Sequence, residues 1–321
     1  MSIERVFAEI RSAMPDRIQC RVHQSPCLSR GIAGRLANLL DAARSTATVN
    51  HIVGDVHYLA LAVPGARTLL TIHDCISLER LRGLKRKLFS WFWFILPVRR
   101  AAMVSVVSES ARKELLRHVW CDPRKVRVIR NCVGSEFTPF AKPFNKYNPT
   151  FLQVGTRPNK NLSRVIAALH GLRCHLKIIG PLNQEHRRCL ADYCIEHSNL
   201  PHATPAELLQ AYREADVVVF VSTYEGFGLP ILEGQATGRP VITSTIFSMP
   251  EVAGPAACFV DPFEISSIRS GIKRLLTDAE YRRMLVAAGF QNVNRFAPEI
   301  IAPEYAAVYE QIAGQAPAQS G

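Results

Sequence analysis

The chain has 321 residues and a formal net charge of +12, and its composition is ordinary for a soluble globular protein. This length favours two α/β domains over one, and no apolar run reaches the ~18 residues that a membrane span needs. All of the excess charge lies in residues 1–150, which hold 24 Lys and Arg against 11 Asp and Glu. This part is therefore expected to face an anionic partner, such as lipid, a phosphorylated acceptor or nucleic acid.

Nine cysteines are scattered along the chain, with no Cys-x-x-Cys pair and no Cys/His cluster at zinc spacing. An odd number without a pairing pattern indicates a reducing cytoplasm, and it argues against both a disulfide framework and a structural zinc site. The first nine residues contain no apolar signal-peptide core, so we expect no signal peptide.

The chain opens with a helical pattern, because Ile3, Val6, Phe7 and Ile10 recur at helical spacing. A doubly wound α/β domain usually opens with a strand and a glycine-rich turn, so the first strand of the N-terminal domain is expected to be missing. Apolar runs predict the next strands, with a helix between the first two, and this alternation favours a parallel sheet. The expected strands are residues 18–22, 48–53, 68–72, 104–107 and 126–129, and the expected helix is 32–43.

The strand at 68–72 ends in His73 and Asp74. Ligands bind at the carboxyl ends of strands in open α/β sheets, so this titratable pair is well placed for chemistry. Asp74 could orient the His73 ring or cap the next turn. The alternative is a pair that only satisfies backbone groups at a strand end.

Residues 84–100 place a row of aromatic and large aliphatic side chains between two basic clusters. The segment fits a helix in a membrane interface, with Trp91 and Trp93 at headgroup depth and the cations on lipid phosphates. It fits equally a helix buried against the sheet. The two interpretations are compatible if one face docks and the other packs.

Residues 134–150 lack periodicity and are rich in Pro, Phe, Asn and Lys, which is typical of a linker. The strand expected at 150–154 leads into a loop with Gly155, Arg157 and Lys160, and then into an amphipathic helix from Leu162. A glycine turn, two cations and a helix N-terminus can form an anion site, although an ordinary solvated loop fits the same residues.

The strand expected at 216–221 leads into a second loop, Glu225-Gly226-Phe227-Gly228-Leu229, followed by Pro230 and a helix that contains Glu233. The glycines leave the backbone unobstructed, so amides at the helix start can point at a diphosphate. An ordinary turn with a solvated glutamate is the alternative. Sequential strands of one sheet place both loops at the same edge. Further strands are expected at 176–179 and 240–243, and helices at 184–195, 205–213, 268–276, 281–288 and 303–312.

Residues 221–244 resemble the E-x7-E signature of family 4 glycosyltransferases, which are retaining enzymes of the GT-B fold with two Rossmann-like domains facing a cleft. Further landmarks of that family occur in the right order at residues 248–254, 260–262, 155–161, 108–109 and 73–74. The match spans nearly the whole chain and is most specific in its second half. It implies an N-terminal acceptor domain at 1–140, a nucleotide-sugar domain at 150–300 and a C-terminal helix and tail at 301–321 that packs back on the first domain.

The resemblance also implies a role for each candidate residue. Glu225 and His73 would be catalytic, the first stabilising positive charge on the sugar and the second meeting its hydroxymethyl side. Glu233 would hold the ribose hydroxyls, and Asp74 and Asn131 would support the site. The diphosphate would contact Gly155, Arg157, Lys160 and the backbone of Gly226, Phe227, Gly228 and Leu229. No metal or other cofactor is expected, because cations and a helix dipole stabilise the leaving diphosphate.

One departure from the family concerns its usual Arg-Lys-Asn cradle, which reads Asn159-Lys160-Asn161 here, so Arg157 would substitute from a shifted place. The expected function is retaining transfer of a hexosyl group to a glycan or lipid-linked acceptor in surface polysaccharide assembly, with GDP-mannose as a weakly favoured donor. The protein would be cytoplasmic, with possible peripheral contact to the inner face of the membrane through residues 84–100. The alternatives are a nucleotide-sugar epimerase or hydrolase of the same fold, and a non-catalytic basic module that binds lipid or nucleic acid; nucleic acid is not expected as a partner of the enzyme.

Overall fold

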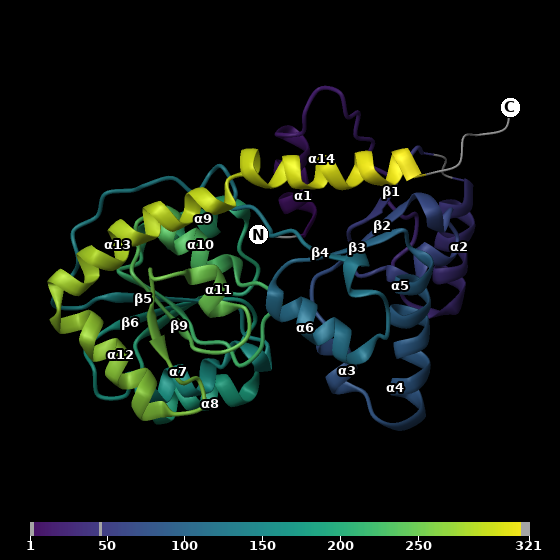
Figure 1. Ribbon diagram of the computed structural model, residues 1–321. Coiled ribbons are helices and arrows are strands. Elements are labelled where there is room, and N and C mark those ends of the chain that lie inside the picture. The colour runs from purple at the N-terminus through teal and green to yellow at the C-terminus, as the bar shows by residue number, and fades with distance from the viewer. Residues whose placement is uncertain (1–2, 45–46, 316–321) are drawn as a thin grey trace, which may run out of the picture. The chain divides into compact units, whose positions relative to one another are not determined.

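The computed structural model describes residues 3–44 and 47–315, and the chain divides into two compact units. The N-terminal unit comprises Ser2–Cys132 together with Pro298–Gly321, and the C-terminal unit comprises Val133–Ala297. Each unit contains one parallel sheet with helices packed on it (Figure 1). The α/β fold with two parallel-sheet domains is thereby confirmed.

The sheet of the N-terminal unit has four parallel strands in the order β1-β2-β3-β4. These strands are β1 (Asn50–Ile52), β2 (Thr68–Ile72), β3 (Met103–Val106) and β4 (Val126–Val128). They confirm four of the five strands predicted for this part. The strand predicted at 18–22 is wrong, because that segment is irregular; Val22 is 68% exposed and finds no apolar surface to cover.

The helices of this unit begin with α1 (Ile3–Ser12), which buries Val6, Phe7 and Ile10 as its spacing predicts. Helix α14 (Pro298–Gln315) belongs to the same unit and packs against α1 and β2 (Figure 1). The remaining helices are α2 (Gly31–Arg44), α3 (Ile76–Arg80), α4 (Gly83–Ser90), α5 (Leu96–Arg100) and α6 (Glu109–His118), with short turns η1 (His57–Leu61), η2 (Gly65–Arg67) and η4 (Pro123–Lys125).

Residues 84–100 form α4, a π-helical turn η3 (Trp91–Ile95) and α5 in succession. Trp93 and Phe94 are buried, whereas Trp91 and Phe92 are about half exposed, at 48% and 53%. The segment is therefore partly buried in the core and partly exposed as an apolar surface, and its contact with a membrane stays a prediction. Among the described residues, no helix is both long and apolar enough to cross a membrane.

The sheet of the C-terminal unit has six parallel strands in the order β10-β9-β8-β5-β6-β7. Their bounds are β5 (Thr150–Val154), β6 (His175–Ile179), β7 (His197–Leu200), β8 (Val217–Phe220), β9 (Val241–Ser244) and β10 (Cys258–Val260). The chain leaves β5 toward one edge of the sheet and returns to β8 on the other side of β5. The order of strands thus reverses between β5 and β8, which is where open α/β sheets bind their ligands.

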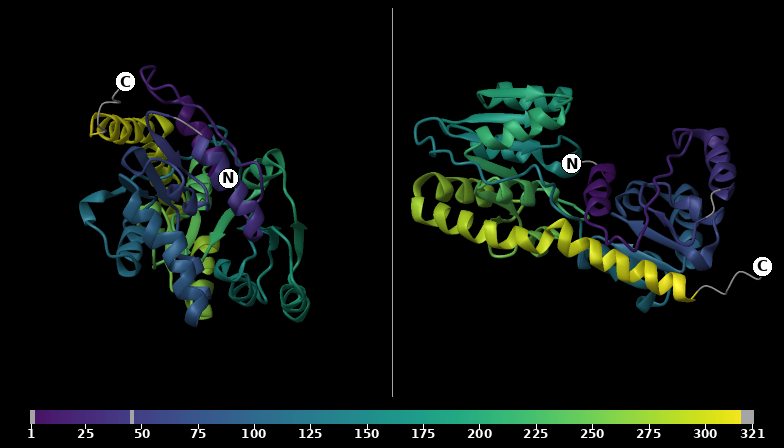
Figure 2. Two further views of the ribbon diagram at one scale, coloured as in Figure 1. Left: turned by 90° about the vertical axis from the view of Figure 1, so that its right-hand side faces the viewer. Right: turned by 90° about the horizontal axis from the view of Figure 1, so that it is seen from above.

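Helices cover both faces of this sheet (Figure 2). Side chains of α7, α8 and α12 share one apolar cluster with Phe151 and Val219. On the other face, α10 lies so close that a Cβ on Gly234 would be 3.0 Å from Val218 and from Val241. The helices are α7 (Leu162–Leu169), α8 (Gln184–Asp192), α9 (Pro205–Glu214), α10 (Leu229–Ala236), α11 (Met249–Ala253), α12 (Ile265–Thr277) and α13 (Ala279–Val293), with turns η5 (Pro158–Lys160) and η6 (Asn294–Phe296).

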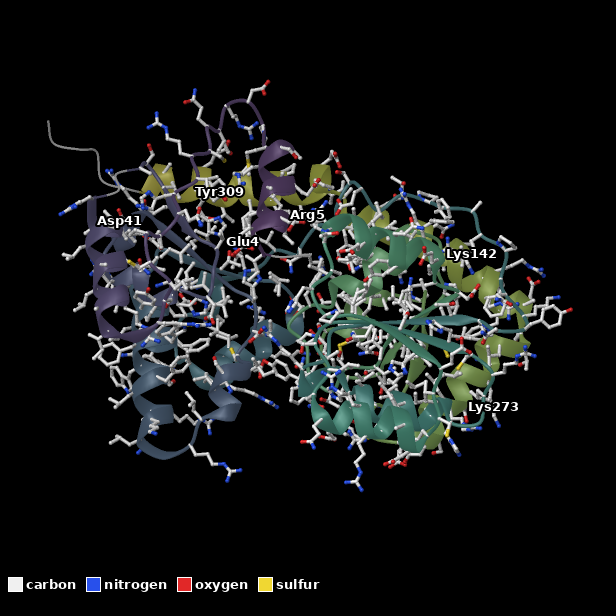
Figure 3. All side chains as sticks on the ribbon, turned by 180° about the vertical axis from the view of Figure 1, so that it is seen from behind. Glu4, Arg5, Asp41, Lys142, Lys273 and Tyr309 are labelled. Carbon is white, nitrogen blue, oxygen red and sulfur yellow. The ribbon has the colours of Figure 1, made fainter. Side chains whose placement is uncertain are left out.

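A polar network ties α14 to the small sheet. His51 on β1 hydrogen-bonds the Tyr309 hydroxyl through Nδ1 at 2.7 Å and Thr71 Oγ1 through Nε2 at 2.6 Å. Thr71 Oγ1 lies 2.5 Å from Ser105 Oγ on β3. Figure 3 labels Tyr309 on α14. Each of these polar groups has a partner, so the helix is held by specific hydrogen bonds as well as by apolar contact.

Acid is expected to destabilise the N-terminal unit through its buried histidines. Burial lowers the pKa of His57 from 6.5 to about 4, an effect that Asp55 partly opposes, and lowers that of His51 to about 3. The neutral rings therefore favour the folded state above pH 6.5, and this stability is lost as the pH falls toward 4. The free energy of unfolding should drop by about 1.4 kcal/mol per pH unit for each histidine.

Urea unfolding at pH 7, 6, 5 and 4.5 measures this slope. His57→Gln is expected to flatten it relative to the wild type, whereas His202→Gln, at an exposed loop position, should leave it unchanged. Equal slopes in all three proteins would contradict the assignment.

Candidate functional site

The loops that follow β5 and β8 meet at the strand-order reversal of the C-terminal sheet. The first contains Gly155 and η5, and the second runs from Val221 into α10. Thr223 N donates to Asn159 O at 2.8 Å, which joins the two loops directly. The structure thus brings the two loops predicted from sequence into contact, and together they are called the donor loops below.

Lys160 and Glu225 form an ion pair at the centre of the donor loops. The Lys160 Nζ to Glu225 Oε1 distance is 2.7 Å, and the side chains are only 18% and 13% exposed. Asn159 Nδ2 donates to the same Oε1 at 3.2 Å, and the Lys160 ammonium lies 4.5 Å from the Phe220 ring centroid. An ammonium that lies over an aromatic ring and is paired with one carboxylate can still bind a second anion.

Two residues shape the first donor loop. Gly155 has φ +89°, and a Cβ there would be 3.0 Å from Lys160 Cε, so glycine makes room for the lysine. Asn161 is left-handed at φ 61°, and its Nδ2 donates to Val221 O at 3.0 Å and to Pro262 O at 2.7 Å. Arg157 is exposed at the start of η5. The loop is therefore anchored around Lys160, and Arg157 is free of that anchoring role.

The second donor loop ends at the N-terminus of α10. Gly228 has φ +113° and precedes Leu229, the first helical residue, with Pro230 in the first turn. Ser248 Oγ lies 3.0 Å from Glu225 O and 2.7 Å from Phe227 O, which fixes the loop backbone on both sides of Gly226. The arrangement places a helix N-terminus, with its partial positive charge, directly after Glu225.

Gly228→Ala is expected to destabilise the C-terminal unit and to weaken anion binding at α10. Its backbone lies in a region that L side chains rarely adopt, and a Cβ would be 3.2 Å from Ile231 Cδ1 and 3.3 Å from Phe220. The backbone strain alone costs about 1–2 kcal/mol. Gly171→Ala is a matched control, because Gly171 has φ +71° and no atom within 4 Å of its Cβ position.

Chemical denaturation and nucleotide affinity are compared for the two variants. Both should lose stability, but only Gly228→Ala should lose affinity as well. If Gly228→Ala binds nucleotide as tightly as the wild type, the N-terminus of α10 is not part of the binding site.

Glu233 lies in α10 but is fully buried. Its Oε2 accepts a hydrogen bond of 2.5 Å from the hydroxyl of Tyr212 on α9, which is also fully buried. Because the side chain is fully buried, a ribose could reach this carboxylate only if Glu233 or its neighbours moved. No local sequence pattern predicts this partner, because Tyr212 lies 21 positions upstream on another helix.

His73, Asp74 and Asn131 belong to the N-terminal unit. His73 Nε2 donates to Val53 O at 2.8 Å, and burial lowers the pKa of the ring, an effect that this bond, Asp74 and Asp55 partly oppose. Asp74 Oδ1 accepts from Ile76 N at 3.0 Å, so Asp74 caps the next turn. Because the pKa of His73 is lowered and its Nε2 donates, the ring is neutral at pH 7 and Nδ1 is its acceptor nitrogen. Asn131 is buried, and its Oδ1 has no hydrogen-bond partner.

Asn159, Asn161 and Ser248 are site residues that the prediction did not assign, although they lie in or near its motifs. Their side chains bind backbone carbonyls or Glu225, which sequence spacing does not reveal. Among the described residues, no three His, Cys, Asp or Glu side chains gather as metal ligands would.

Family models match both parts of the chain: Glycosyltransferase Family 4 covers residues 9–137, and Glycosyl transferases group 1 covers residues 135–292. The chain belongs to the family 4 glycosyltransferases. Curated members include O-antigen chain mannosyltransferase B of Escherichia coli, 27% identical over 62% of this chain and 58% of the relative. Another is the MMP alpha-(1->4)-mannosyltransferase of Mycolicibacterium hassiacum, 25% identical over 79% of this chain and 67% of the relative.

Solved structures of glycosyltransferases share the GT-B fold with this family member. WaaG, a glycosyltransferase involved in lipopolysaccharide biosynthesis, has a TM-score of 0.73 at 15% identity, covering 96% of both chains. Alr3699/HepE of Anabaena, in complex with UDP and glucose, has a TM-score of 0.74 at 17% identity, covering 87% of this chain and 82% of the other. The chain spans 58% of the length of the first curated relative, and 32% of a serotype-specific mannosyltransferase, WbdA of Escherichia coli.

Proposed function

We propose that this protein is a retaining hexosyltransferase that uses a nucleotide diphosphate sugar, with GDP-mannose as the first donor to test, and builds surface polysaccharide on a glycan or lipid-linked acceptor. The ion pair of Lys160 and Glu225 at the start of α10 carries the proposal. The choice of mannose follows from those curated relatives that are named mannosyltransferases.

The chain's own residues have distinct roles in the proposed transfer. Lys160 and the N-terminus of α10 bind the diphosphate and stabilise its charge as it departs. Glu225, released from Lys160 by the diphosphate, faces the sugar and stabilises its developing positive charge. Arg157 adds a second cation from an exposed position. No divalent metal is needed in this scheme, so activity should survive EDTA.

A thermal-shift screen of UDP, GDP and ADP sugars tests the donor site, because a ligand that binds only the folded state raises Tm. We expect a shift with one nucleotide class that disappears in Lys160→Ala. A screen without any shift, or a shift that Lys160→Ala retains, would contradict the donor site. Sugar-nucleotide turnover without an acceptor would favour the epimerase or hydrolase alternative.

His73 is proposed to act in the transfer step. His73→Ala is therefore expected to retain the nucleotide-induced shift of the C-terminal unit and to lose transfer activity. Loss of the shift itself would contradict this division of roles.

The second part of the proposal is peripheral attachment to an anionic membrane through the N-terminal unit. Leu84, Leu88, Trp91 and Phe92 recur at helical spacing along α4 and η3 and are 71%, 52%, 48% and 53% exposed. The intervening cations at 85–87 are exposed, and a cavity of about 420 Å³ beside them is lined by Arg86, Lys87 and Trp91, among others. Apolar side chains between cations fit a lipid interface.

A second apolar row lies on the neighbouring helix α2, where Ile32, Leu36 and Leu40 are 79%, 53% and 64% exposed. The Arg35 guanidinium of α2 lies 4.8 Å from the ring centroid of Trp93 in η3, so the two elements are in contact. Figure 1 labels α2. The proposed membrane surface therefore includes both helices.

Co-sedimentation with vesicles of phosphatidylglycerol and phosphatidylcholine tests this surface. Leu88→Asp combined with Ile32→Asp should abolish binding, whereas Met284→Asp, at an equally exposed position on α13, should not. Binding that persists in the double variant, or that ignores the anionic lipid content, would contradict the proposal.

A further inference from the structure

A second cavity, of about 910 Å³, lies in the C-terminal unit away from the donor loops. Its floor includes Asp216, directly before β8, and Pro240, directly before β9. Its walls are residues 139–144 and the helix α13. One donor loop follows the carboxyl end of β8, so this four-residue strand, about 13 Å long, separates the two sites. This space is called the linker cavity below.

The linker cavity is lined by one carboxylate, Asp216, and by four cations, Lys142, Arg239, Arg282 and Arg283. Lys142 Nζ is paired with Asp216, and Figure 3 shows Lys142 beside the helices of this unit. Burial lowers the pKa of Arg239, an effect that Asp216 partly opposes, and it lowers the pKa of Arg282, an effect that Asp278 and Asp216 partly oppose. Asp216 is the only acid among the described residues that line the cavity. Lys142 is already paired with Asp216, and Asp278 and Glu280 interact with Arg282 and Arg283. Among the described residues that line the cavity, the buried Arg239 therefore has no carboxylate of its own, although buried charges are normally paired.

The arginines retain hydrogen-bonding capacity after their contacts within the protein are counted. Arg239 is 4% exposed; its Nη2 donates to Phe140 O, and its Nε has no partner. Arg282 donates through Nη1 to Leu275 O at 2.6 Å and to Leu276 O at 3.2 Å, and its guanidinium lies 3.8 Å from the Phe144 ring centroid. These contacts hold residues 139–144 in place and leave a buried guanidinium nitrogen unsatisfied, which is costly unless a ligand binds it.

The walls of the linker cavity favour a ligand with an apolar part. Phe140, Phe144, Val286 and Phe290 line the cavity, and its volume lies within the range of small-molecule sites. We propose that the linker cavity binds an organic phosphate monoester, whose phosphate supplies the missing counter-charge for Arg239 and whose organic part packs on the aromatic wall. This inference does not depend on the donor-site assignment.

The probe for this site is phenyl phosphate, compared with inorganic phosphate and with neutral benzyl alcohol by isothermal titration calorimetry. All titrations use full-length protein carrying Lys160→Ala, so that phosphate binding at the donor loops is suppressed. Ala287→Trp fills the cavity from an exposed position of α13 without removing a hydrogen bond. Ala191→Trp, on an exposed position of α8 outside the cavity lining, is the matched control.

We expect phenyl phosphate to bind at least tenfold more tightly than either of the other probes, and to weaken at least tenfold in Ala287→Trp with no change in Ala191→Trp. Circular dichroism verifies that both variants are folded. If benzyl alcohol binds as tightly as phenyl phosphate, the phosphate group contributes nothing to binding. If inorganic phosphate binds as tightly, the aromatic wall contributes nothing. Either result, or binding that Ala287→Trp leaves intact, would overturn the proposal.

Discussion

Lys160→Ala is expected to lower kcat/KM for sugar transfer by about 10²–10³, the loss typical of removing one preorganised group that stabilises transition-state charge. Lys160 Nζ is 2.7 Å from Glu225 Oε1, and the ammonium lies over the Phe220 ring in a site that is largely screened from water. A positive charge in such surroundings acts strongly on a departing diphosphate. Arg157→Ala, at an exposed position, should cost less than tenfold.

The ion pair raises a second explanation, in which Lys160 matters only because it positions Glu225. Nucleotide affinity in a double-mutant cycle separates the two. If Lys160 binds the diphosphate, Lys160→Ala weakens nucleotide binding to a similar extent in the wild type and in Glu225→Gln. If it acts only through Glu225, the substitution has no further effect in the Glu225→Gln background.

Asp216→Ala is expected to destabilise the C-terminal unit by about 3–5 kcal/mol, the usual cost of removing one partner from a buried ion pair. Asp216 is 3% exposed, and it accepts hydrogen bonds from Asn145 N at 3.0 Å and Thr150 N at 2.8 Å besides its pairing with Lys142. The substitution leaves two backbone donors and a cation without their acceptor at the start of the central strands.

Urea unfolding of Asp192→Ala is the matched comparison, because Asp192 pairs with Arg188 on the exposed surface of α8, 3.5 Å apart. Exposed pairs contribute at most about 1 kcal/mol. Similar losses in the two variants would show that the burial of Asp216 does not determine its contribution.

The central strands could be predicted because they are continuous apolar runs, as parallel strands covered on both faces must be. β2 and β5 have the predicted bounds. Strand β7, His197–Leu200, could not be predicted, because three of its four residues are polar and it lies at the edge of the sheet. The helix predicted at 184–195 ends at Asp192, since Cys194 adopts a positive φ of 49°.

The contact between the two donor loops could be predicted from the sequence. Contacts between side chains that lie far apart in the sequence could not. The loops of Lys160 and Glu225 meet because their strands are neighbours, and strand order follows from the fold. The burial of Glu233 depends on Tyr212, and the anchoring of the first donor loop depends on an Asn161 contact to Pro262, 101 residues away. Such pairs follow from tertiary packing and leave no local pattern.

The contact between Lys160 and Glu225 also has a consequence for ligand discrimination. A neutral free sugar has no charged group that can replace the Glu225 carboxylate beside the Lys160 ammonium, so the ion pair stays intact. At the proposed donor site, a phosphorylated ligand would compete for the same ammonium. By displacing Glu225, it would make an anionic carboxylate oxygen available only when a leaving group is present. The resting pair would in this way protect the enzyme against unproductive occupancy by abundant monosaccharides, and it would link exposure of the catalytic carboxylate to arrival of the activated substrate.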